Sequence, residues 1–355
     1  MNEEKQYTIK DIARMAGVSA GTVDRVLHHR GEVSASSKQK VEAILKEIDY
    51  KPNVYAIGLA RKKKYNFACL IPQFQPNDYW FFVAEGIKKA LEEMASFNIT
   101  VSYIHYDHSD RLSYIAAGER LLEQTFDAVL IAPNYSAETL NITSHLCEKG
   151  IPFVFVDVNV EEAGALGYIG QDSFRSGYIT ARILNDTRYS GQEIVLLSTE
   201  NDLDSQEIQM QHRLEGFKAY MQEHQIDIKM HNVVLRRDHK DDYLILDDFF
   251  RKHPLVRGGV VFNSQIYRVG EFLKESSYSL DSLIGYDLLP RNVELLKEGI
   301  IHFLVGQRPG MQGYGGIKML ADKVVFKREL VSLCYMPIDI IIKENLDYYV
   351  ESYNL

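Results

Sequence analysis

The sequence predicts a small all-α head followed by an α/β body of two lobes, each built as a doubly wound parallel sheet. Residues 7–64 contain three short helical patterns, a fourth after a proline, and a run of four basic residues. From residue 67 onward, short apolar segments alternate with amphipathic helical segments. This alternation is typical of parallel sheets covered by helices. With 355 residues and 46% hydrophobic content, the chain can fill more than one core.

The head begins with two short helical patterns separated by a tight turn. Thr8 is suited to cap the first helix, with Asp11 as the acidic member of a capping box, and Gly17 ends that helix. Ser19 caps the second helix, predicted at residues 20–27, whose apolar residues lie on one face. Two helices joined in this way form a helix-turn-helix, and its second helix can enter the major groove of DNA.

Two further helices are predicted in the head. Residues 35–48 follow a run of serines and carry apolar residues at core spacing, so this third helix supports the other two. After Pro52, residues 53–60 form a fourth helical segment. An isolated helix of that length is marginal in water, so we expect it to fold only together with a partner.

Two motifs of the head resemble a known family. The run T-I-K-D-I-A-x-x-A-G-V-S-x-x-T-V-x-R-V-L at residues 8–27 and the run Y-K-P-N-x-x-A-x-x-L at residues 50–59 resemble the DNA-binding domain of the lactose-repressor (LacI-type) family of bacterial transcription regulators. The resemblance implies a DNA-binding domain at residues 1–51, a hinge helix and basic linker at 52–64, and a ligand-binding domain at 65–355. The alternative is a three-helix bundle without a DNA role, but core packing does not explain the second motif.

The resemblance also assigns single residues of the head to DNA binding. In the family, the start of the second helix faces base edges, and the hinge helices of a dimer meet in the minor groove, where leucines wedge between base steps. Arg25 is the candidate for a bidentate contact to guanine, and Asp24 stands where a serine is usual. The assigned residues are Thr8, Ser19, Ala20, Gly21, Thr22, Arg25, His28, Asn53, Ala56 and Leu59.

The charge is divided unevenly between head and body. Residues 1–64 hold 13 Lys and Arg against 8 Asp and Glu, whereas the remainder holds 27 basic against 41 acidic residues. The head is therefore at +5 and the body at −14, which together make the overall charge of −9. A basic head suits contact with phosphates, and an acidic body is repelled by them.

The strand patterns of the body fall into two sets. They lie at residues 67–72, 99–106, 126–133 and 151–158, and then at 193–199, 231–237, 258–263, 283–287, 300–309 and 333–342. The pattern resembles the periplasmic-binding-protein (type I) fold that the repressor family carries. That resemblance implies an N-lobe of about residues 65–171 plus 288–308, and a C-lobe of about 172–287 plus 309–355. A ligand cleft is expected where the carboxyl ends of the strands converge.

Polar residues at strand and helix ends mark the predicted ligand site. VFVD ends in Asp157, VVFN in Asn263 and IGYD in Asp287, VGQRP carries Gln307, and Arg213 belongs to a segment similar to the R-x-x-G-F of sugar-binding lobes. In ribose-type binding proteins such residues grip sugar hydroxyls, and an aromatic ring stacks on the sugar. Each residue has a structural alternative as a helix cap, a salt-bridging residue or a core aromatic. The assigned set is Tyr79, Trp80, Phe81, Asp157, Arg213, Asn263, Asp287 and Gln307.

Other functional classes are not favoured. The sequence has no nucleophile elbow, no HExxH and no recognisable catalytic carboxylate pair, so we expect no enzymatic activity and no cofactor. The histidines at 105 and 108 are interpreted as part of a polar loop and the three cysteines form no CxxC pair, so no metal site is expected. The start MNEEKQ lacks the apolar segment of a signal peptide, and no apolar run approaches the ~20 residues of a membrane span. A cytoplasmic protein without a membrane partner is expected.

These features predict a homodimeric transcription regulator, a repressor, that binds a pseudo-palindromic double-stranded operator. A small effector, expected to be a monosaccharide, would close the cleft, change the spacing of the two hinge helices and release DNA. The alternatives are the same architecture sensing a phosphorylated sugar or a nucleobase and, further away, a sugar-binding transport receptor. Several carboxylates and a single arginine at the cleft favour a neutral polyol.

Overall fold

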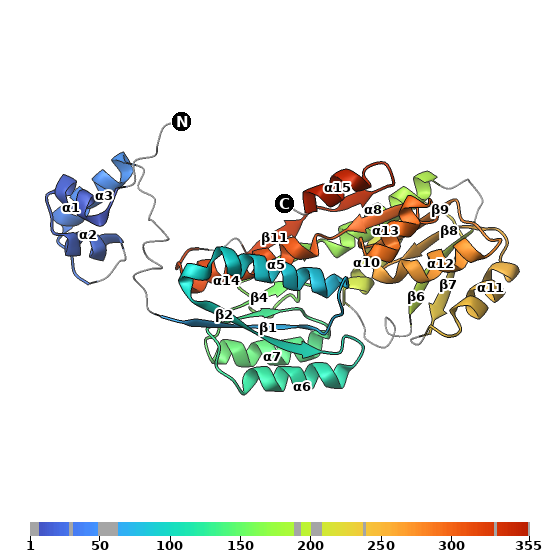
Figure 1. The fold of residues 1–355 in the computed structure, drawn as a ribbon, viewed down its shortest axis with the longest axis horizontal. Helices are drawn as coiled ribbons and strands as arrows, with labels where there is room; N and C mark the ends of the chain where they lie inside the picture. Colours follow the sequence, from blue (N-terminus) through green and yellow to red (C-terminus); the bar gives the residue numbers. More distant parts are fainter. Residues whose placement is uncertain are drawn as a thin grey trace. The chain divides into compact units, whose positions relative to one another are not determined.

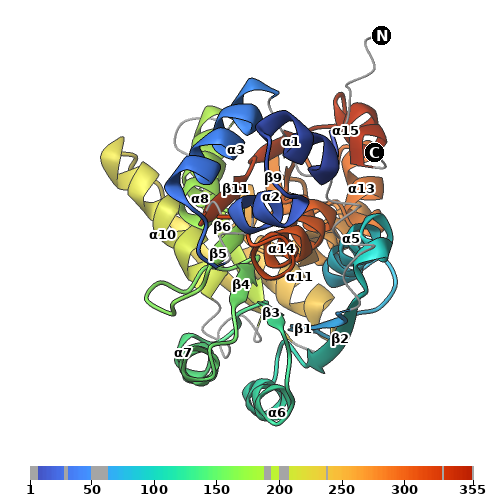
Figure 2. The same cartoon turned by 90° about the vertical axis from the view of Figure 1, so that its left-hand side faces the viewer.

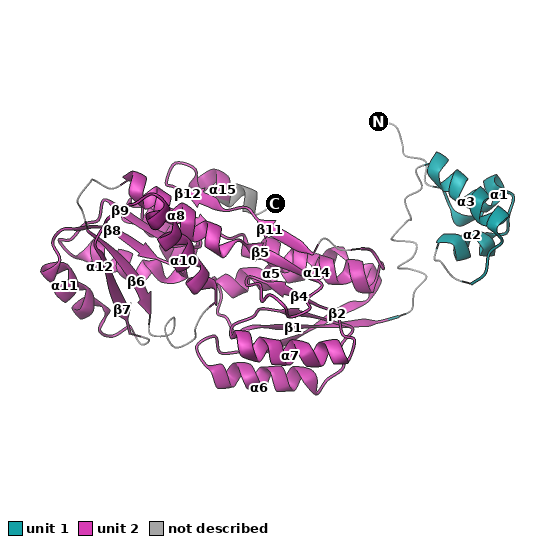
Figure 3. Cartoon of the chain, turned by 180° about the vertical axis from the view of Figure 1, so that it is seen from behind, with its two compact units in different colours: residues 1–63 teal, residues 64–355 magenta. Residues whose placement is uncertain are grey.

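The fold is taken from a computed structural model of the chain. The residues that it describes are 7–27, 31–48, 63–187, 193–199, 208–236, 239–329 and 332–353. The chain divides into two compact units, Met1–Lys63 and Lys64–Leu355, which we call the head and the body (Figure 3).

The head is a bundle of three helices around a small apolar core. They are α1 (Ile9–Ala16), α2 (Ala20–Leu27) and α3 (Ala35–Glu47), and the last two match their predicted bounds to within one residue. The core consists of Ile12, Ala13, Ala16, Val23, Val26 and Val41. The predicted hinge helix at residues 53–60 lies outside the described residues.

Local hydrogen bonds hold the helix-turn-helix together. Thr8 Oγ1 accepts a hydrogen bond from the backbone N–H of Asp11 (3.3 Å), and Asp11 Oδ2 accepts one from the backbone N–H of Thr8 (3.1 Å), so the predicted capping box is confirmed. Gly17 ends α1 with φ 65°, a left-handed conformation that would strain a side chain. Ser19 Oγ accepts a hydrogen bond from the Thr22 N–H (3.1 Å) and so caps α2.

Within the described residues, the body contains two six-stranded sheets (Figure 1). The N-lobe sheet has the order β11-β5-β4-β3-β1-β2, with all strands parallel. Its strands are β1 (Tyr65–Pro72), β2 (Ile99–Tyr106), β3 (Ala128–Ile131), β4 (Phe153–Val156), β5 (Gly167–Gln171) and β11 (Leu333–Met336). The C-lobe sheet has the order β12-β10-β9-β8-β6-β7, parallel except that β12 is antiparallel to β10. Its strands are β6 (Glu193–Thr199), β7 (Met230–Leu235), β8 (Val256–Val261), β9 (Ser282–Tyr286), β10 (Phe303–Gly306) and β12 (Asp339–Ile341).

Helices cover both faces of the N-lobe sheet. α5 (Tyr79–Glu93) and α14 (Pro309–Val324) pack together on one face, and α6 (Arg111–Leu122) and α7 (Ser136–Glu148) lie on the other (Figures 1 and 2). The short helix η1 (Ala95–Phe97) follows α5. The central strands β1, β3 and β4 are buried almost throughout between these helices, which explains why they are nearly continuous apolar runs in the sequence.

The C-lobe sheet is covered in the same way. α8 (Ser173–Thr187) and α10 (Ile208–Glu223) share one core with Ile194 and Leu196 of β6, while Val195 and Leu197 belong to the core on the opposite face. The helices of the C-lobe's second face and its end are α11 (Asp242–Lys252), η2 (Ser264–Ile266), α12 (Tyr267–Glu275), α13 (Pro290–Lys297) and α15 (Leu346–Tyr353). Among the described residues, no helix combines the length and the apolar character needed to cross a membrane.

The predicted division between the lobes is wrong at its C-terminal parts. The resemblance implies that residues 288–308 belong to the N-lobe and residues 309–355 to the C-lobe, but β10 pairs with β9 in the C-lobe sheet. α14 packs against α5, and β11 pairs with β5 in the N-lobe sheet. The N-lobe therefore comprises residues 64–171 and about 309–336, and the C-lobe the rest of the body. Hydrophobic alternation identifies strands, but it does not tell which sheet each strand joins.

The segment 333–342, predicted as one strand, is two strands in different sheets. Pro337 separates β11 from β12, and proline has no backbone N–H to continue a ladder. The chain passes between the lobes after β5, after β10 and at this proline. Gln171, buried at the first passage, donates from Nε2 to the carbonyl oxygens of Gly306 (3.0 Å) and Pro337 (2.9 Å). One side chain thus ties the three passages together.

The contact between α5 and α14 gives a stability prediction with an internal control. A Cβ added at Gly313 would lie 2.0 Å from the Val83 carbonyl oxygen, whereas one added at Gly310 would lie 3.6 Å from the Phe82 carbonyl oxygen. We expect Gly313→Ala to destabilise the body by about 1–3 kcal/mol, because the backbone of α5 or α14 must move to make room for the methyl group. Gly310→Ala should be neutral or stabilising, by up to about 1 kcal/mol, since alanine favours the helix. Thermal unfolding of both variants checks this, and equal midpoints would contradict the close packing.

Candidate functional site

A cavity of about 390 Å³ lies between the two lobes of the body. Its walls are formed largely by residues that follow the carboxyl ends of strands in both sheets, which is where ligands bind in parallel α/β folds. Its volume is within the range of small-molecule sites. Seven of the eight predicted ligand residues line it, namely Tyr79, Trp80, Asp157, Arg213, Asn263, Asp287 and Gln307.

Phe81, the eighth predicted residue, does not line the cavity. Its ring packs edge-on against Phe74 (6.4 Å between centroids) and Phe82 (5.5 Å). Successive residues of a helix point about 100° apart, so Tyr79, Trp80 and Phe81 of α5 do not share one direction. The prediction of a cleft role for Phe81 is therefore wrong, and its structural alternative as a packing aromatic is correct.

Asp157 and Asp287 occupy equivalent places in the two lobes. Asp157 follows β4 and Asp287 follows β9, and these strands hold the same position in the two sheet orders. Both residues have left-handed backbone conformations, with φ of 71° and 68°. Both side chains are buried, so each lobe presents one carboxylate at the bottom of the cavity.

Amide side chains connect the two carboxylates. Gln209 Nε2 donates to Asp157 Oδ1 (3.0 Å) and to Gln307 Oε1 (3.2 Å). Gln307 Nε2 in turn donates to Asp287 Oδ1 (2.9 Å) and Oδ2 (3.1 Å). The Tyr79 hydroxyl donates to Asp157 Oδ1 (2.6 Å). The two lobes are therefore joined across the cavity floor by a continuous chain of hydrogen bonds.

Arg213 is the cation of this network and is almost fully buried. Its Nη2 donates to Gln307 Oε1 (2.6 Å) and its Nη1 to the Phe262 carbonyl oxygen (2.6 Å). The guanidinium stacks over the Tyr286 ring, 3.8 Å from the centroid. Nε has no hydrogen-bond partner among the described residues. Arg213 thus orients Gln307 as well as facing the cavity, and it is not the surface salt-bridging residue of the structural alternative.

Burial shifts the titration of both carboxyl groups. It raises the pKa of Asp287 to about 7, although the positive charge of Arg213 and the hydrogen bond from Gln307 act in the opposite direction. Burial also raises the pKa of Asp157, against the hydrogen bond from Tyr79 and the charge of Arg213. The cavity floor therefore holds two carboxyl groups that are costly to charge without further hydrogen-bond donors.

Several lining residues were not predicted from sequence. Gln209 lies four residues before Arg213 on α10, so helical periodicity could have placed it on the same face. Asn134 follows β3 at a strand end, which is the signal that identified the other residues. His108 and Tyr267 also line the cavity, and no motif in the sequence marks them.

Most of the predicted DNA-binding residues in the described part of the head are exposed. The cap residue Ser19 is exposed, as are Ala20, Gly21 and Arg25 of α2, whereas Val23 and Val26 of the same helix are buried in the core. Thr8 is exposed at the start of α1, and Thr22 is half-buried with its hydroxyl 2.9 Å from Ser19 Oγ. His28, Asn53, Ala56 and Leu59 lie outside the described residues.

Comparison with known proteins places these two units in one family. Residues 8–53 match the model of the lacI family of bacterial regulatory proteins, and residues 67–328 match that of a periplasmic binding protein domain. A solved structure from Bacteroides fragilis, provisionally assigned as a LacI transcriptional regulator, is 42% identical and has a TM-score of 0.77. That match covers 81% of this chain and 100% of the other. The chain belongs to the LacI family. The resemblance found in the sequence motifs is confirmed.

Two further relatives are more distant from this LacI-family chain. The HTH-type transcriptional regulator DegA of Bacillus subtilis is 24% identical over 217 residues, which is 61% of each protein. The match therefore spans less than two thirds of that relative's length. GanP, a glucose-galactose binding protein from Geobacillus stearothermophilus, is 23% identical with a TM-score of 0.68, covering 80% of this chain and 99% of the other. This likeness shows the fold of the body.

Proposed function

We propose that this LacI-family chain is a DNA-binding transcription regulator, a repressor, whose affinity for its operator depends on a monosaccharide bound between the lobes. The observation that carries the proposal is the combination of two sites in one chain. The head has a helix-turn-helix with an exposed face on α2, and the body has a polar cavity whose floor is supplied by both lobes. A helix-turn-helix reads DNA with that helix, and a cavity between lobes allows a ligand to change their arrangement.

The lining of the cavity favours an uncharged polyol as effector. Its acidic residues are Asp78, Asp107, Asp157 and Asp287, whereas Arg213 is its only arginine or lysine among the described residues. A ligand with a phosphate or carboxylate group would be repelled by these acidic residues, which makes its binding less favourable. Sugar hydroxyls can donate to the carboxylates and accept from Arg213 or the amides. Trp80 and Tyr267 line the same cavity and can cover the apolar face of a sugar ring.

The body offers a physical route from ligand to DNA. A sugar that contacts Asp157 of the N-lobe and Asp287 of the C-lobe favours one arrangement of the lobes, and the three passages near Gln171 act as the hinge. The head is joined through residue 63 to β1 of the N-lobe. In a homodimer on a pseudo-palindromic operator, lobe closure would change the spacing of the two hinge segments and release DNA. The coupling is reciprocal, so operator DNA must lower sugar affinity by the same factor.

A ligand screen followed by a DNA titration tests this proposal. Neutral monosaccharides, sugar phosphates and nucleobases are screened by thermal unfolding of the full chain, where a ligand at 100 times its Kd stabilises the protein by about 2.7 kcal/mol. We expect one neutral monosaccharide to raise Tm and to weaken operator binding in fluorescence anisotropy. A response only to a sugar phosphate or nucleobase would contradict the polyol assignment. A bound sugar that leaves operator affinity unchanged would contradict the coupling.

A further inference from the structure

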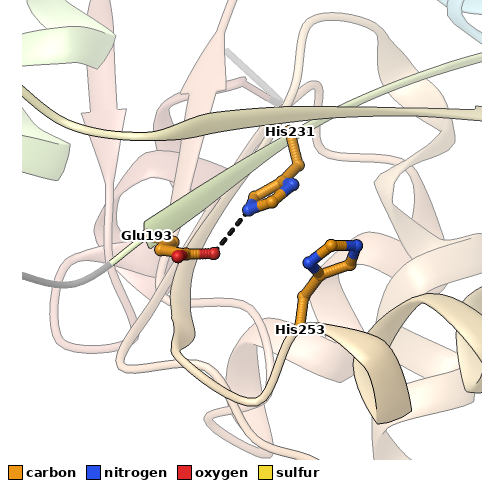
Figure 4. Close-up of side chains that lie close together, drawn as sticks. All are labelled: Glu193, His231 and His253. Atoms are coloured by element: carbon orange, nitrogen blue, oxygen red, sulfur yellow. Dashed lines mark hydrogen bonds and ion pairs between the residues drawn. The ribbon is translucent and has the colours of Figure 1, made fainter.

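Three potential metal ligands meet at the amino end of the C-lobe sheet. Glu193 is the first residue of β6, His231 is the second residue of the neighbouring strand β7, and His253 follows the last residue of α11 (Figure 4). The strands run from this end towards the cavity, so the cluster lies at the opposite end of the sheet from Asn263 and Asp287. It is not part of the proposed effector site.

The three side chains converge closely. Each residue offers one potential ligand atom, which is a carboxylate oxygen of Glu193 or an imidazole nitrogen of a histidine. These three atoms all lie within 4.8 Å of one another. His231 Nε2 is 2.5 Å from Glu193 Oε2, and the rings of His231 and His253 are 4.1 Å apart between centroids. Ligands bound tetrahedrally at 2.0–2.2 Å from Zn²⁺ are roughly 3.4 Å from one another. Small side-chain rotations would therefore bring all three onto one ion.

The surroundings hold the two imidazoles in place. Phe249 of α11 packs against both rings, with centroid distances of 5.7 Å to His231 and 4.9 Å to His253. All three potential ligands are half-buried, so they are partly shielded from water yet reachable by a dissolved ion. Within the described residues, neither ring nitrogen of His253 has a hydrogen-bond partner in this cluster or elsewhere, so one of them is available to coordinate.

We propose that Glu193, His231 and His253 bind a divalent transition metal ion of the Zn²⁺ class. Two imidazoles and one carboxylate form a donor set that suits Zn²⁺ and its neighbours, whereas Mg²⁺ prefers a shell of oxygen ligands. Lys229 Nζ lies 3.0 Å from the other carboxylate oxygen, Glu193 Oε1, and so orients the carboxylate while leaving Oε2 on the side of the histidines. Three protein ligands leave a fourth position for water.

The site would connect three segments that are distant in the sequence. Glu193 and His253 are separated by 60 positions, and no metal-binding spacing motif marks them, so the sequence gives no reason to expect a metal here. A bound ion would link the starts of β6 and β7 to the end of α11. Because the unfolded chain does not hold these residues together, binding must stabilise the folded C-lobe.

Zinc binding by the full chain, free of affinity tags, tests the proposal. The protein is treated with a chelator, dialysed, and titrated with ZnCl₂ against a chromogenic zinc indicator. We expect the wild-type protein to bind one more equivalent of Zn²⁺ per chain than the Glu193→Gln and His253→Ala variants do. We also expect Zn²⁺, but not Mg²⁺, to raise the Tm of the wild-type protein. His212→Ala is the matched control, because His212 is an exposed histidine of the same lobe outside the cluster. It should bind zinc as the wild type does.

The variants separate a metal site from a polar cluster that only packs. Glu193→Gln keeps the size of the side chain, so it remains informative if His253→Ala does not fold. Equal zinc stoichiometry in wild type, Glu193→Gln and His253→Ala would overturn the proposal, because the zinc would then bind elsewhere. A zinc-independent Tm in the wild type would overturn it as well.

Discussion

Replacing Asp287 with asparagine is expected to weaken effector binding by about 10- to 150-fold while making the ligand-free protein more stable above pH 7. A hydrogen bond to a charged group contributes about 1.5–3 kcal/mol, and one such bond from a sugar hydroxyl would be lost. In the free protein the same carboxylate is buried and accepts hydrogen bonds from Gln307. Among the described residues, no basic side chain lies within salt-bridge distance of it. Removing its charge therefore relieves a desolvation cost.

The sign of the pH dependence follows from the direction of the pKa shift. The pKa of Asp287 is raised from 3.8 to about 7 by burial, so between these values the folded state binds a proton that the unfolded state has lost. The contribution of Asp287 to the free energy of unfolding is fully present below about pH 4 and is lost as pH rises through 7. The free energy of unfolding thereby declines on the order of 4 kcal/mol. The pKa of Asp157 is shifted in the same direction, so Asp287→Asn makes the decline shallower and does not abolish it.

Isothermal titration with the effector and chemical unfolding at several pH values measure both effects. Glu161→Gln is the matched control, because Glu161 is an exposed carboxylate of the N-lobe outside the cavity. It removes the same charge and should change neither effector affinity nor the pH profile. An Asp287→Asn protein with wild-type sugar affinity would show that this carboxylate does not contact the ligand. An unchanged pH profile would show that its burial is not costly.

Replacing Arg25 with alanine is expected to lower affinity for the operator by about 5- to 150-fold and to reduce the ratio of specific to non-specific binding. Arg25 is exposed on α2, on the same side as Gly21 and Thr22, which are four and three residues earlier. A bidentate arginine–guanine contact discriminates by about 1–3 kcal/mol. Because Ala20 and Gly21 offer almost no polar readout, a large share of base recognition by this helix should depend on Arg25.

Fluorescence anisotropy with an operator selected by the wild-type protein from random duplexes measures this effect, with a scrambled duplex for non-specific binding. Arg14→Ala is the control, because Arg14 is an exposed arginine of the same head whose side chain pairs with Asp11 at 2.6 Å. It removes the same charge and should weaken both duplexes about equally through lost phosphate attraction. If the Arg25→Ala protein keeps the wild-type ratio of specific to non-specific affinity, Arg25 does not read bases.

Much of the head could be predicted because its determinants are local. The cap formed by Thr8 and Asp11, the left-handed Gly17 and the cap at Ser19 each involve residues within four positions of one another. The cavity residues at strand ends could be predicted for a related reason, since the carboxyl ends of parallel strands meet at one edge of a sheet. Phe81 was misplaced because a run of aromatics on a helix does not state which ring faces a ligand.

The sequence by itself determined the helical head, the strand positions, the family and most of the polar residues around the cavity, because these depend on periodicity, caps and short motifs. Only the tertiary structure decided that β10 belongs to the C-lobe and β11 to the N-lobe, that Gln209 and Gln307 link Asp157 to Asp287, and that Glu193, His231 and His253 meet. Periodicity reports which face of an element a residue occupies. The partner across that face is set by long-range packing, in which residues separated by dozens of positions compete for the same neighbours.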